Sequence, residues 1–268
     1  MQPLNADEVK QIQLDILDEI ARICKKNDIE FFLAYGSLIG AMRHQGVIPW
    51  DDDIDIWMKR AHYEKFIKCF NEKKSSDIYA KDFCDDGKSI FQFLKVINTQ
   101  TSVKENFIRK DVNLGIWVDV FPLDESSDTI LRLGVARKIS RLLWIRSFAL
   151  ADPDVGSSAF VKLAKKIISP FARKVNVSQL CAKVDRLAKT KDANGEAGSH
   201  LADLVAEATL DYSYNKSWFD HVEYAEFEGR QMPVPAFYDE ILTLRYGNWR
   251  QVPPEKDRAV HICQSYRI

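Results

Sequence analysis

The first thirty residues carry apolar side chains at helical spacing. Apolar positions recur every three or four residues, which predicts an amphipathic helix over residues 7–27. Asn5, with Glu8 three positions later, has the pattern of a capping box at the beginning of this helix. The apolar positions are Val9, Ile12, Ile16, Ile20 and Ile23.

Shorter apolar runs follow, separated by turn residues. We predict strands over residues 31–35, 53–58, 89–98, 101–105 and 115–121, and helices over residues 37–43 and 62–70. The strands over 89–98 and 101–105 are expected to pair with each other. Pro122 is expected to end the strand over 115–121, because proline cannot donate to a β ladder.

The second half of the chain changes to consecutive helices. Residues 128–190 show helical spacing with few strand patterns, and a β-like stretch over 222–235 precedes a helix over 236–246 and a tail that contains proline. We therefore predict an α+β protein with a mixed sheet in a core over residues 1–125. The largely helical remainder, residues 126–268, would end in a β and proline-rich segment that packs back on this core.

Charge and cysteine content narrow the class of protein. The 268 residues carry a net charge of -1, so no excess of positive charge points to nucleic acid. The five cysteines are scattered and include no CxxC pair, which argues against a disulfide framework or a zinc site and favours a reducing cytoplasm. The polar N-terminus is unlike a signal peptide, and the longest uncharged apolar stretch, residues 31–42, is too short to span a bilayer.

The most informative segment is an acidic cluster that runs into an apolar strand. If residues 53–56 are extended, Asp53 and Asp55 lie on the same face with Cα atoms about 6.6 Å apart. Such carboxylates repel each other unless a cation lies between them, and hard oxygen ligands suit Mg²⁺ or Mn²⁺ shared with a substrate phosphate. The alternative is a solvated acidic turn. Ile54 and Ile56 argue against that alternative, because unpaired charge is costly in an apolar strand.

Two further features fit phosphate chemistry. Gly36 and Ser37 fall at the predicted beginning of a helix, where backbone N–H groups and a hydroxyl can bind phosphate. Asp119 stands alone in an otherwise apolar strand, and a metal cluster would give it a partner. It would then complete a second metal site or accept the proton of an attacking hydroxyl. The alternative for Asp119 is a buried carboxylate satisfied by a backbone N–H or an arginine.

Residues 33–66, which begin LAYGSLIGAMRHQGVIPWDDDIDIW, closely resemble the LicD family of bacterial phosphocholine transferases. The eukaryotic relatives of that family are the fukutin-type ribitol-phosphate transferases. The resemblance extends to FLKV at 93–96, to GIWVDVFPLD at 115–124 and to short matches in the tail, so it covers nearly the whole chain. Residues 128–220 match weakly and leave the acceptor open.

The resemblance implies a nucleotidyltransferase (polymerase-β-like) fold. It also implies transfer of phosphocholine from CDP-choline to a sugar hydroxyl of teichoic acid or lipopolysaccharide, with release of CMP. The metal ligands would be Asp53, Asp55 and Asp119, and Gly36 and Ser37 would lie at the phosphate. The metal would be Mg²⁺ or Mn²⁺, the acceptor a lipid-linked glycan, and the location the cytoplasm, with no nucleic acid as partner.

Three other functions stay open. The donor could be CDP-ribitol or CDP-glycerol, with the same mechanism. The protein could be a nucleotidyltransferase that releases pyrophosphate. It could also be a glycan- or membrane-binding protein without catalytic activity, although the intact acidic triad speaks against that reading.

Other side chains are weaker candidates for substrate binding. Arg43 and His44 could contact phosphate or belong to a surface loop. Lys95, in an apolar strand, could face the metal-bound phosphates or be a lysine at a strand edge. Trp50 or Tyr246 could form a cation–π wall for the quaternary ammonium of choline, or belong to the core.

Three polar residues receive no direct role. Asp51 and Asp52 are expected in the loop around the ligands rather than among them. His261, near the C-terminus, has no assignable function.

Residues 132–174 are rich in positive charge. Ten Lys or Arg residues stand against Asp152 and Asp154 there, and they alternate with apolar residues at helical spacing. A pair of basic amphipathic helices could lie on the anionic inner leaflet of a membrane, where a lipid-linked acceptor would be presented. The alternative is an ordinary packed helix pair with a solvated basic face.

Overall fold

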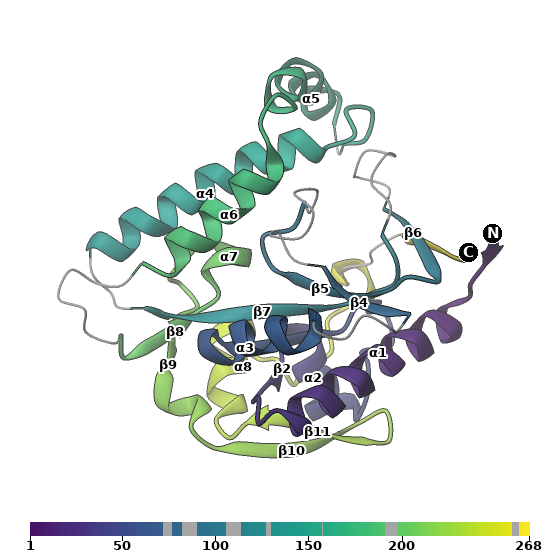
Figure 1. The fold of residues 1–268 in the computed structure, drawn as a ribbon, viewed down its shortest axis with the longest axis vertical. Coiled ribbons are helices and arrows are strands. Elements are labelled where there is room, and N and C mark those ends of the chain that lie inside the picture. Colours follow the sequence, from purple (N-terminus) through teal and green to yellow (C-terminus); the bar gives the residue numbers. More distant parts are fainter. Residues whose placement is uncertain are drawn as a thin grey trace.

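A mixed sheet of seven strands organises the described part of the chain (Figure 1). The structure is a computed structural model and describes residues 1–71, 77–81, 90–105, 114–126, 130–156, 158–190, 198–258 and 263–268. The strand order is β2-β3-β7-β5-β4, and β8 and β9 extend the sheet from β7. The strands are β2 (Phe32–Leu33), β3 (Asp55–Lys59), β4 (Ile78–Lys81), β5 (Leu94–Asn98), β7 (Trp117–Ser126), β8 (His200–Ala202) and β9 (Tyr214–Asn215).

The long strand β7 lies at the centre of this sheet. It runs parallel to β3 on one side and antiparallel to β5 on the other. Parallel strands need a crossover connection, and the chain between β3 and β7 includes α3 (Arg60–Asn71), which packs against both strands. The sheet is therefore mixed, as the sequence predicts.

Three helices from the first part of the chain accompany the sheet. α1 (Ala6–Lys26) begins at Asn5, whose side chain accepts a hydrogen bond from Glu8 N while the Glu8 carboxylate accepts one from Asn5 N, so the predicted capping box is confirmed. α1 and α3 pack against the sheet and contribute to the main apolar core. α2 (Tyr35–His44) lies between β2 and β3 in the chain and ends where Gln45 adopts a left-handed backbone conformation.

The consecutive helices predicted after β7 are confirmed, and we call α4 (Ile130–Leu150), α5 (Ala159–Ala172) and α6 (Val177–Ala188) the helical arm. They follow one another, and Figure 1 shows them on the other side of β7 from α1 and α3. α4, α6 and the short α7 (Leu204–Glu207) enclose a second apolar cluster. No described helix is long and apolar enough to cross a membrane.

The last part of the chain packs against and pairs with elements of its first part. The hairpin β10 (Val222–Phe227) and β11 (Arg230–Pro235) packs against α2 and β2, and α8 (Tyr238–Tyr246) follows it. β12 (Cys263–Arg267) pairs with β6 (Thr101–Glu105) and with β1 (Gln2–Pro3) in a separate three-stranded sheet. The main apolar core joins residues from both sides of residue 125. The division into domains at that position stays a prediction.

Several element boundaries differ from the predictions. β3 begins at Asp55, so Asp53 precedes the strand, and α2 begins at Tyr35 rather than at Ser37. β5 and β6 are both strands, but they do not pair with each other, because β4 and β7 already occupy the two edges of β5. The short strands β1, β4, β8, β9 and β12 have no counterpart among the predicted elements.

The prediction that Pro122 ends its strand is wrong. β7 continues to Ser126, with Pro122 opposite Met58 of β3. Asp119 donates its N–H to Ile54 O on the β3 side, so alternation directs the nitrogen of Pro122 to the β5 side. The pairing with β5 extends no further than Val120, and the missing N–H therefore costs no ladder hydrogen bond.

Candidate active site

Three charged residues occupy one row across the centre of the sheet. The register places Asp55 of β3 opposite Asp119 of β7, and Asp119 opposite Lys95 of β5. Directly opposed residues share one face of a sheet, so the three side chains lie side by side. They are 9%, 7% and 4% exposed, respectively. The row combines two predicted metal ligands with the predicted phosphate-binding lysine.

Asp119 is held by two neighbours. Lys95 Nζ lies 2.6 Å from Asp119 Oδ1 and 2.8 Å from Oδ2, and Trp117 donates its indole N–H to Oδ2 at 3.1 Å. The Lys95 ammonium also lies 4.2 Å from the centre of the Trp117 ring. Asp119 therefore has protein partners, as the alternative to a metal expected, but they are a lysine and a tryptophan rather than a backbone N–H or an arginine.

The row contains two carboxylates but only one ammonium group. Burial, followed by the nearby charges of Asp53 and Asp119, raises the pKa of Asp55 well above its usual range. Burial also raises the pKa of Asp119, although Lys95 opposes the rise. Within the described residues Lys95 makes an ion pair with Asp119, and no ion pair reaches Asp55. A cation bound beside Asp55 would relieve this repulsion.

Asp53 joins the site from a loop rather than from a strand. The predicted strand begins two residues too early, because β3 begins only at Asp55, so strand alternation does not place Asp53. The Asp53 charge nevertheless acts on both Asp55 and Asp119. The three predicted carboxylates therefore lie close together, but the loop, rather than strand alternation, places Asp53 among them.

Asp51 and Asp52 lie closer to the site than expected. Carboxylate oxygens of Asp51, Asp52 and Asp53 all lie within 4.8 Å of one another, a spacing compatible with a shared cation. The Asp51 charge also raises the pKa of Asp55. The chemistry of the donor set, all carboxylate oxygen, suits Mg²⁺ or Mn²⁺. The residues present therefore fit a divalent metal.

The Gly-Ser pair supports this loop and the start of β3. Ser37 is buried, and its Oγ accepts a hydrogen bond from Asp55 N at 2.9 Å. A Cβ at Gly36 would collide with Asp51 Oδ2, so only glycine permits this approach of the carboxylate to α2. Ser37 thus positions the first residue of β3. The contact of Gly36 and Ser37 with phosphate stays a prediction.

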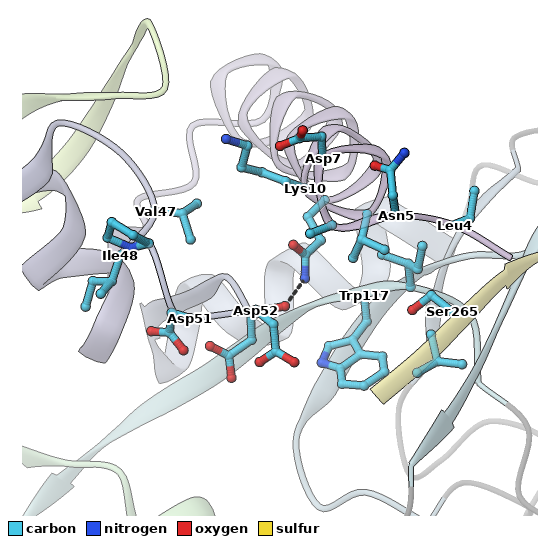
Figure 2. Close-up of a pocket in the computed structure, with 17 residues that line it drawn as sticks. Leu4, Asn5, Asp7, Lys10, Val47, Ile48, Asp51, Asp52, Trp117 and Ser265 are labelled. Atoms are coloured by element: carbon cyan, nitrogen blue, oxygen red, sulfur yellow. Dashed lines mark hydrogen bonds between the residues drawn. The ribbon is translucent and has the colours of Figure 1, made fainter. Parts of the chain in front are cut away.

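A pocket opens beside the acidic loop. Its cavity has a volume of about 510 Å³, and Figure 2 shows Asp51, Asp52 and Trp117 on one side of it and Asn5 with Asp7 and Lys10 of α1 on the other, Asn5 being the residue that caps the helix. Gln13 of α1 donates to Asp52 O at 2.7 Å and so fixes the loop to that helix. The remaining lining is largely apolar and includes Val9, Val47, Ile48, Val103 and Ile116. A mostly apolar cavity with a few polar groups is typical of a small-molecule site.

Arg43 and Trp50 lie beside each other, and both contact residues in the C-terminal part of the chain. Arg43 donates to Trp249 O at 2.6 Å and to His44 Nε2 at 2.9 Å. The Arg258 guanidinium lies 4.2 Å from the centre of the Trp50 ring, and that of Arg43 lies 6.0 Å from it. Trp50 therefore already stacks on a cation of the protein itself. The role of these residues toward substrate stays a prediction.

Tyr246 belongs to an aromatic box that holds a cation. The Arg245 guanidinium lies 4.3 Å from the ring centre of Tyr35, 4.7 Å from that of Tyr212 and 5.3 Å from that of Tyr246, and it pairs with Glu207. Burial raises the pKa of Tyr246 and the charge of Asp55 adds to the rise, so the box lies within electrostatic reach of the acidic row. His261 lies outside the described residues.

Trp117 and Gln13 are site residues that the sequence analysis missed. Trp117 stands two positions before Asp119 in a strand, so alternation alone directs both side chains to the same face. That signal was available in the sequence. No comparable signal exists for Gln13, because its contact with the Asp52 carbonyl depends on how α1 packs.

Comparisons with known proteins agree with the predicted resemblance. The family model described as "LicD/FKTN/FKRP, nucleotidyltransferase domain" matches residues 28–148, which include the whole charged row. The chain is 27% identical over 286 aligned positions to the lipopolysaccharide cholinephosphotransferase LicD of Haemophilus influenzae, with 100% of both chains covered. An uncharacterized protein of Rickettsia typhi is 33% identical over 69 residues, 24% of this chain and 22% of that protein. One of Rickettsia prowazekii is 44% identical over 41 residues, 15% of each.

Proposed function

This chain is a transferase of the LicD family, and from that premise we propose that it transfers phosphocholine from CDP-choline to a sugar hydroxyl of a cell-surface glycan. CMP is the leaving product. The fold we propose for the core is the nucleotidyltransferase (polymerase-β-like) fold. The relative from Haemophilus influenzae acts on lipopolysaccharide by its name, and teichoic acid is a second acceptor of the same chemical class.

The observation that carries this proposal is the buried row of Asp55, Asp119 and Lys95. Two buried carboxylates beside each other are costly in a protein that binds no cation. The same pair next to a lysine suits a substrate that brings phosphate and metal together. The row therefore supports phosphate transfer over a purely structural role.

The proposed cofactor is Mg²⁺ or Mn²⁺, held by Asp53, Asp55 and Asp119. When bound, it would neutralise the charge of the donor phosphates. Asp51 is an additional carboxylate beside this set, and its charge also raises the pKa of Asp55. Ser37 holds the backbone of Asp55 and so orients one proposed ligand.

Residues of the chain itself would bind the phosphate, accept the proton and position the base. Lys95, released from part of its pairing with Asp119, faces the donor phosphate as a fixed positive charge. Asp119 accepts the proton of the attacking sugar hydroxyl at a carboxylate oxygen. Trp117 keeps Asp119 in position through its indole N–H.

The pocket beside Asp51–Asp53 is the proposed site of the donor nucleoside. Its volume and its apolar lining suit a nucleoside, and the carboxylates at one side lie where the diphosphate would begin. The aromatic box of Tyr35, Tyr212 and Tyr246 already favours a cation, which is the chemistry that quaternary ammonium recognition requires. We assign the choline group to the Tyr246 side of the acidic row.

The proposed acceptor is lipid-linked and is met at the cytoplasmic face of a membrane. The basic residues within 132–174 support contact with anionic lipid. This part of the proposal is separable from the chemistry, because it concerns where the acceptor is presented.

The test is CMP release from CDP-choline with Mg²⁺, with and without a glycan acceptor and with EDTA as a control. We expect CMP that depends on metal and rises with acceptor. Asp55→Asn should reduce the rate at least a thousandfold, about 4 kcal/mol of transition-state stabilisation. Asp211→Asn, an exposed aspartate elsewhere, is the matched control and should leave the rate unchanged.

The products distinguish the other functions. Release from CDP-ribitol or CDP-glycerol, but not from CDP-choline, would keep the mechanism and change the donor. Pyrophosphate from a nucleoside triphosphate would replace the proposal by nucleotidyl transfer. Full activity of Asp55→Asn would refute the site, and metal binding without turnover of any donor would favour a binding protein.

A further inference from the structure

Helix α5 presents an apolar stripe to solvent. Phe160, Leu163, Ile167 and Phe171 are 79%, 57%, 59% and 70% exposed. At 100° per residue these four positions fall within an arc of about 80° on the helix. Single exposed apolar residues are ordinary, but a continuous stripe of large ones marks an interaction surface.

The stripe is not required by the interior of the molecule. Among the described residues, neither apolar core cluster includes a member of α5. The helix packs on α4 through its other side, where Ser169 and Ala172 are buried. Figure 1 shows α5 at one end of the molecule, beyond α4 and α6 and away from the seven-stranded sheet. The stripe is therefore free to meet a surface.

The charge around the stripe indicates which kind of surface the stripe would contact. Residues 155–175 contain five Lys or Arg residues and no acidic residue. Lys166 has a side chain that is 58% exposed, and its partner Asp154 precedes the segment. Lys174 lies at the end of the stripe, with its ammonium 5.8 Å from the Phe171 ring centre. Large apolar side chains bordered by lysines are the composition of helices that lie in a membrane interface.

We propose that α5 anchors the protein to a lipid surface with anionic headgroups. The stripe enters the boundary between headgroups and acyl chains, and the neighbouring cations contact the headgroups. The inference rests on the proposed function, because a lipid-linked acceptor would be presented at that surface.

The proposal narrows the expectation for residues 132–174 to one helix. α4 buries Val135, Ala136 and Ile139 in the second apolar cluster, and its apolar residues are spread around the helix. Arg146 of α4 donates to Ile90 O at 2.6 Å. Leu133 and Trp144 of α4 are exposed but lie about three turns apart, whereas α5 carries a continuous exposed apolar stripe together with positive charge.

Vesicle sedimentation of the full chain tests the anchor. The probes are vesicles of phosphatidylcholine alone and vesicles that also contain phosphatidylglycerol. We expect binding to the anionic vesicles that weakens as salt increases. Phe160→Ser combined with Phe171→Ser should weaken it at least tenfold, whereas Tyr224→Ser, an aromatic residue 67% exposed on β10, should not.

Charge reversal supplies a second pair of variants. Lys162→Glu with Lys166→Glu should weaken binding at least tenfold, whereas Lys25→Glu with Lys26→Glu, the same charge change at exposed positions of α1, should have little effect. Equal loss in both pairs would show attraction by net charge alone and would overturn a specific anchor. Wild-type protein that stays in solution at low salt would overturn it as well.

Two further measurements separate the remaining explanations. Sedimentation velocity without lipid would reveal a dimer; a dimer that the Phe160→Ser, Phe171→Ser variant dissociates, without vesicle binding, would assign the stripe to a second copy and overturn the proposal. CMP release with a soluble acceptor should be equal in this variant and the wild type, and only the rate with vesicle-borne acceptor should fall. Absence of CMP from every donor would refute the proposed function, while vesicle binding would still decide the anchor.

Discussion

Asp55 and Asp119 are neighbours in the sheet, yet within the described residues only Asp119 makes an ion pair. Without metal, Asp55→Asn should therefore raise the melting temperature, because it removes a buried carboxylate whose pKa is raised by burial and by Asp53. Asp119→Asn should lower the free energy of unfolding by about 3 kcal/mol, because it leaves Lys95 buried and unpaired. Thermal unfolding in EDTA measures both. Adding Lys95→Met to Asp119→Asn should restore most of the loss; a double variant no more stable than the single one would contradict this account.

Asp203 gives a prediction for pH dependence at the same scale. Its buried carboxyl accepts hydrogen bonds from Tyr35 Oη and Ala206 N, and burial raises its pKa to about 7. The unfolded value is about 3.9, so between these values the native state holds a proton that the unfolded state has released. The wild type should lose up to about 1.4 kcal/mol per pH unit as pH rises through this window.

Asp203→Asn removes that loss. Its melting temperature relative to the wild type should rise steadily between pH 4 and pH 7 and then level off. The matched variant Asp211→Asn alters an exposed aspartate in the same region and should show no such trend. Parallel curves for Asp203→Asn and the wild type would show that Asp203 titrates at its ordinary value.

At the scale of elements, two glycines in helices have opposite surroundings. A Cβ at Gly134 of α4 would meet no atom within 4 Å, whereas one at Gly40 of α2 would collide with the backbone oxygen of Gly46. Gly134→Ala should stabilise the protein by about 0.5–1 kcal/mol, since alanine is the better helix former. Gly40→Ala should cost about 1–3 kcal/mol, because backbone must move. Urea denaturation measures both, and equal effects would show that α2 has room beside this turn.

The Gly40 contact also bears on the active site. Gly46 N donates to Gly40 O at 3.3 Å in the turn that leads to the acidic loop. Gly40→Ala should therefore weaken Mg²⁺ binding as well as stability, whereas Gly134→Ala should leave metal binding unchanged. Calorimetric titration of both variants with Mg²⁺ separates these outcomes.

At the scale of the whole molecule, Arg60 connects the sheet to the helical arm. It makes two hydrogen bonds of 2.7 Å to Asp124 of β7 and one of 2.8 Å to Asp185 of α6. Arg60→Met should lower the free energy of unfolding by about 3–5 kcal/mol, because both carboxylates are largely buried. Lys189→Met removes a more exposed partner of Asp185 and should cost less than about 1 kcal/mol. Similar losses in the two variants would contradict a buried connection.

Calorimetry of the same variants tests the predicted boundary at residue 125. The main core contains Leu17 and Val120 together with Phe227 and Ile241, so we expect the wild type to unfold in one transition. In Arg60→Met the arm of α4 to α6 should melt before the sheet. Two transitions in the wild type would instead show that the parts of the chain unfold independently.

Local patterns were sufficient for much of this protein. The spacing of apolar residues determined α1, α3 and the helical stretch after β7, and Asn5 with Glu8 determined a helix beginning, because these features depend on neighbours three or four positions apart. Asp55 and Asp119 could be selected because a lone carboxylate in an apolar strand needs a partner. The family resemblance followed from residues that are contiguous in the chain.

Contacts between distant segments needed the tertiary structure. The register of β3, β7 and β5 alone made Lys95 the partner of Asp119, and the pairing of β5 with both its neighbours excluded β6. The loop brought Asp53 into range although β3 begins only at Asp55. The sequence predicted two basic amphipathic helices within 132–174, but the apolar residues of α4 are spread around that helix and several are buried, whereas those of α5 form an exposed stripe. Sequence spacing fixes which residues share a face of one element, whereas the burial of that face depends on the elements that pack against it.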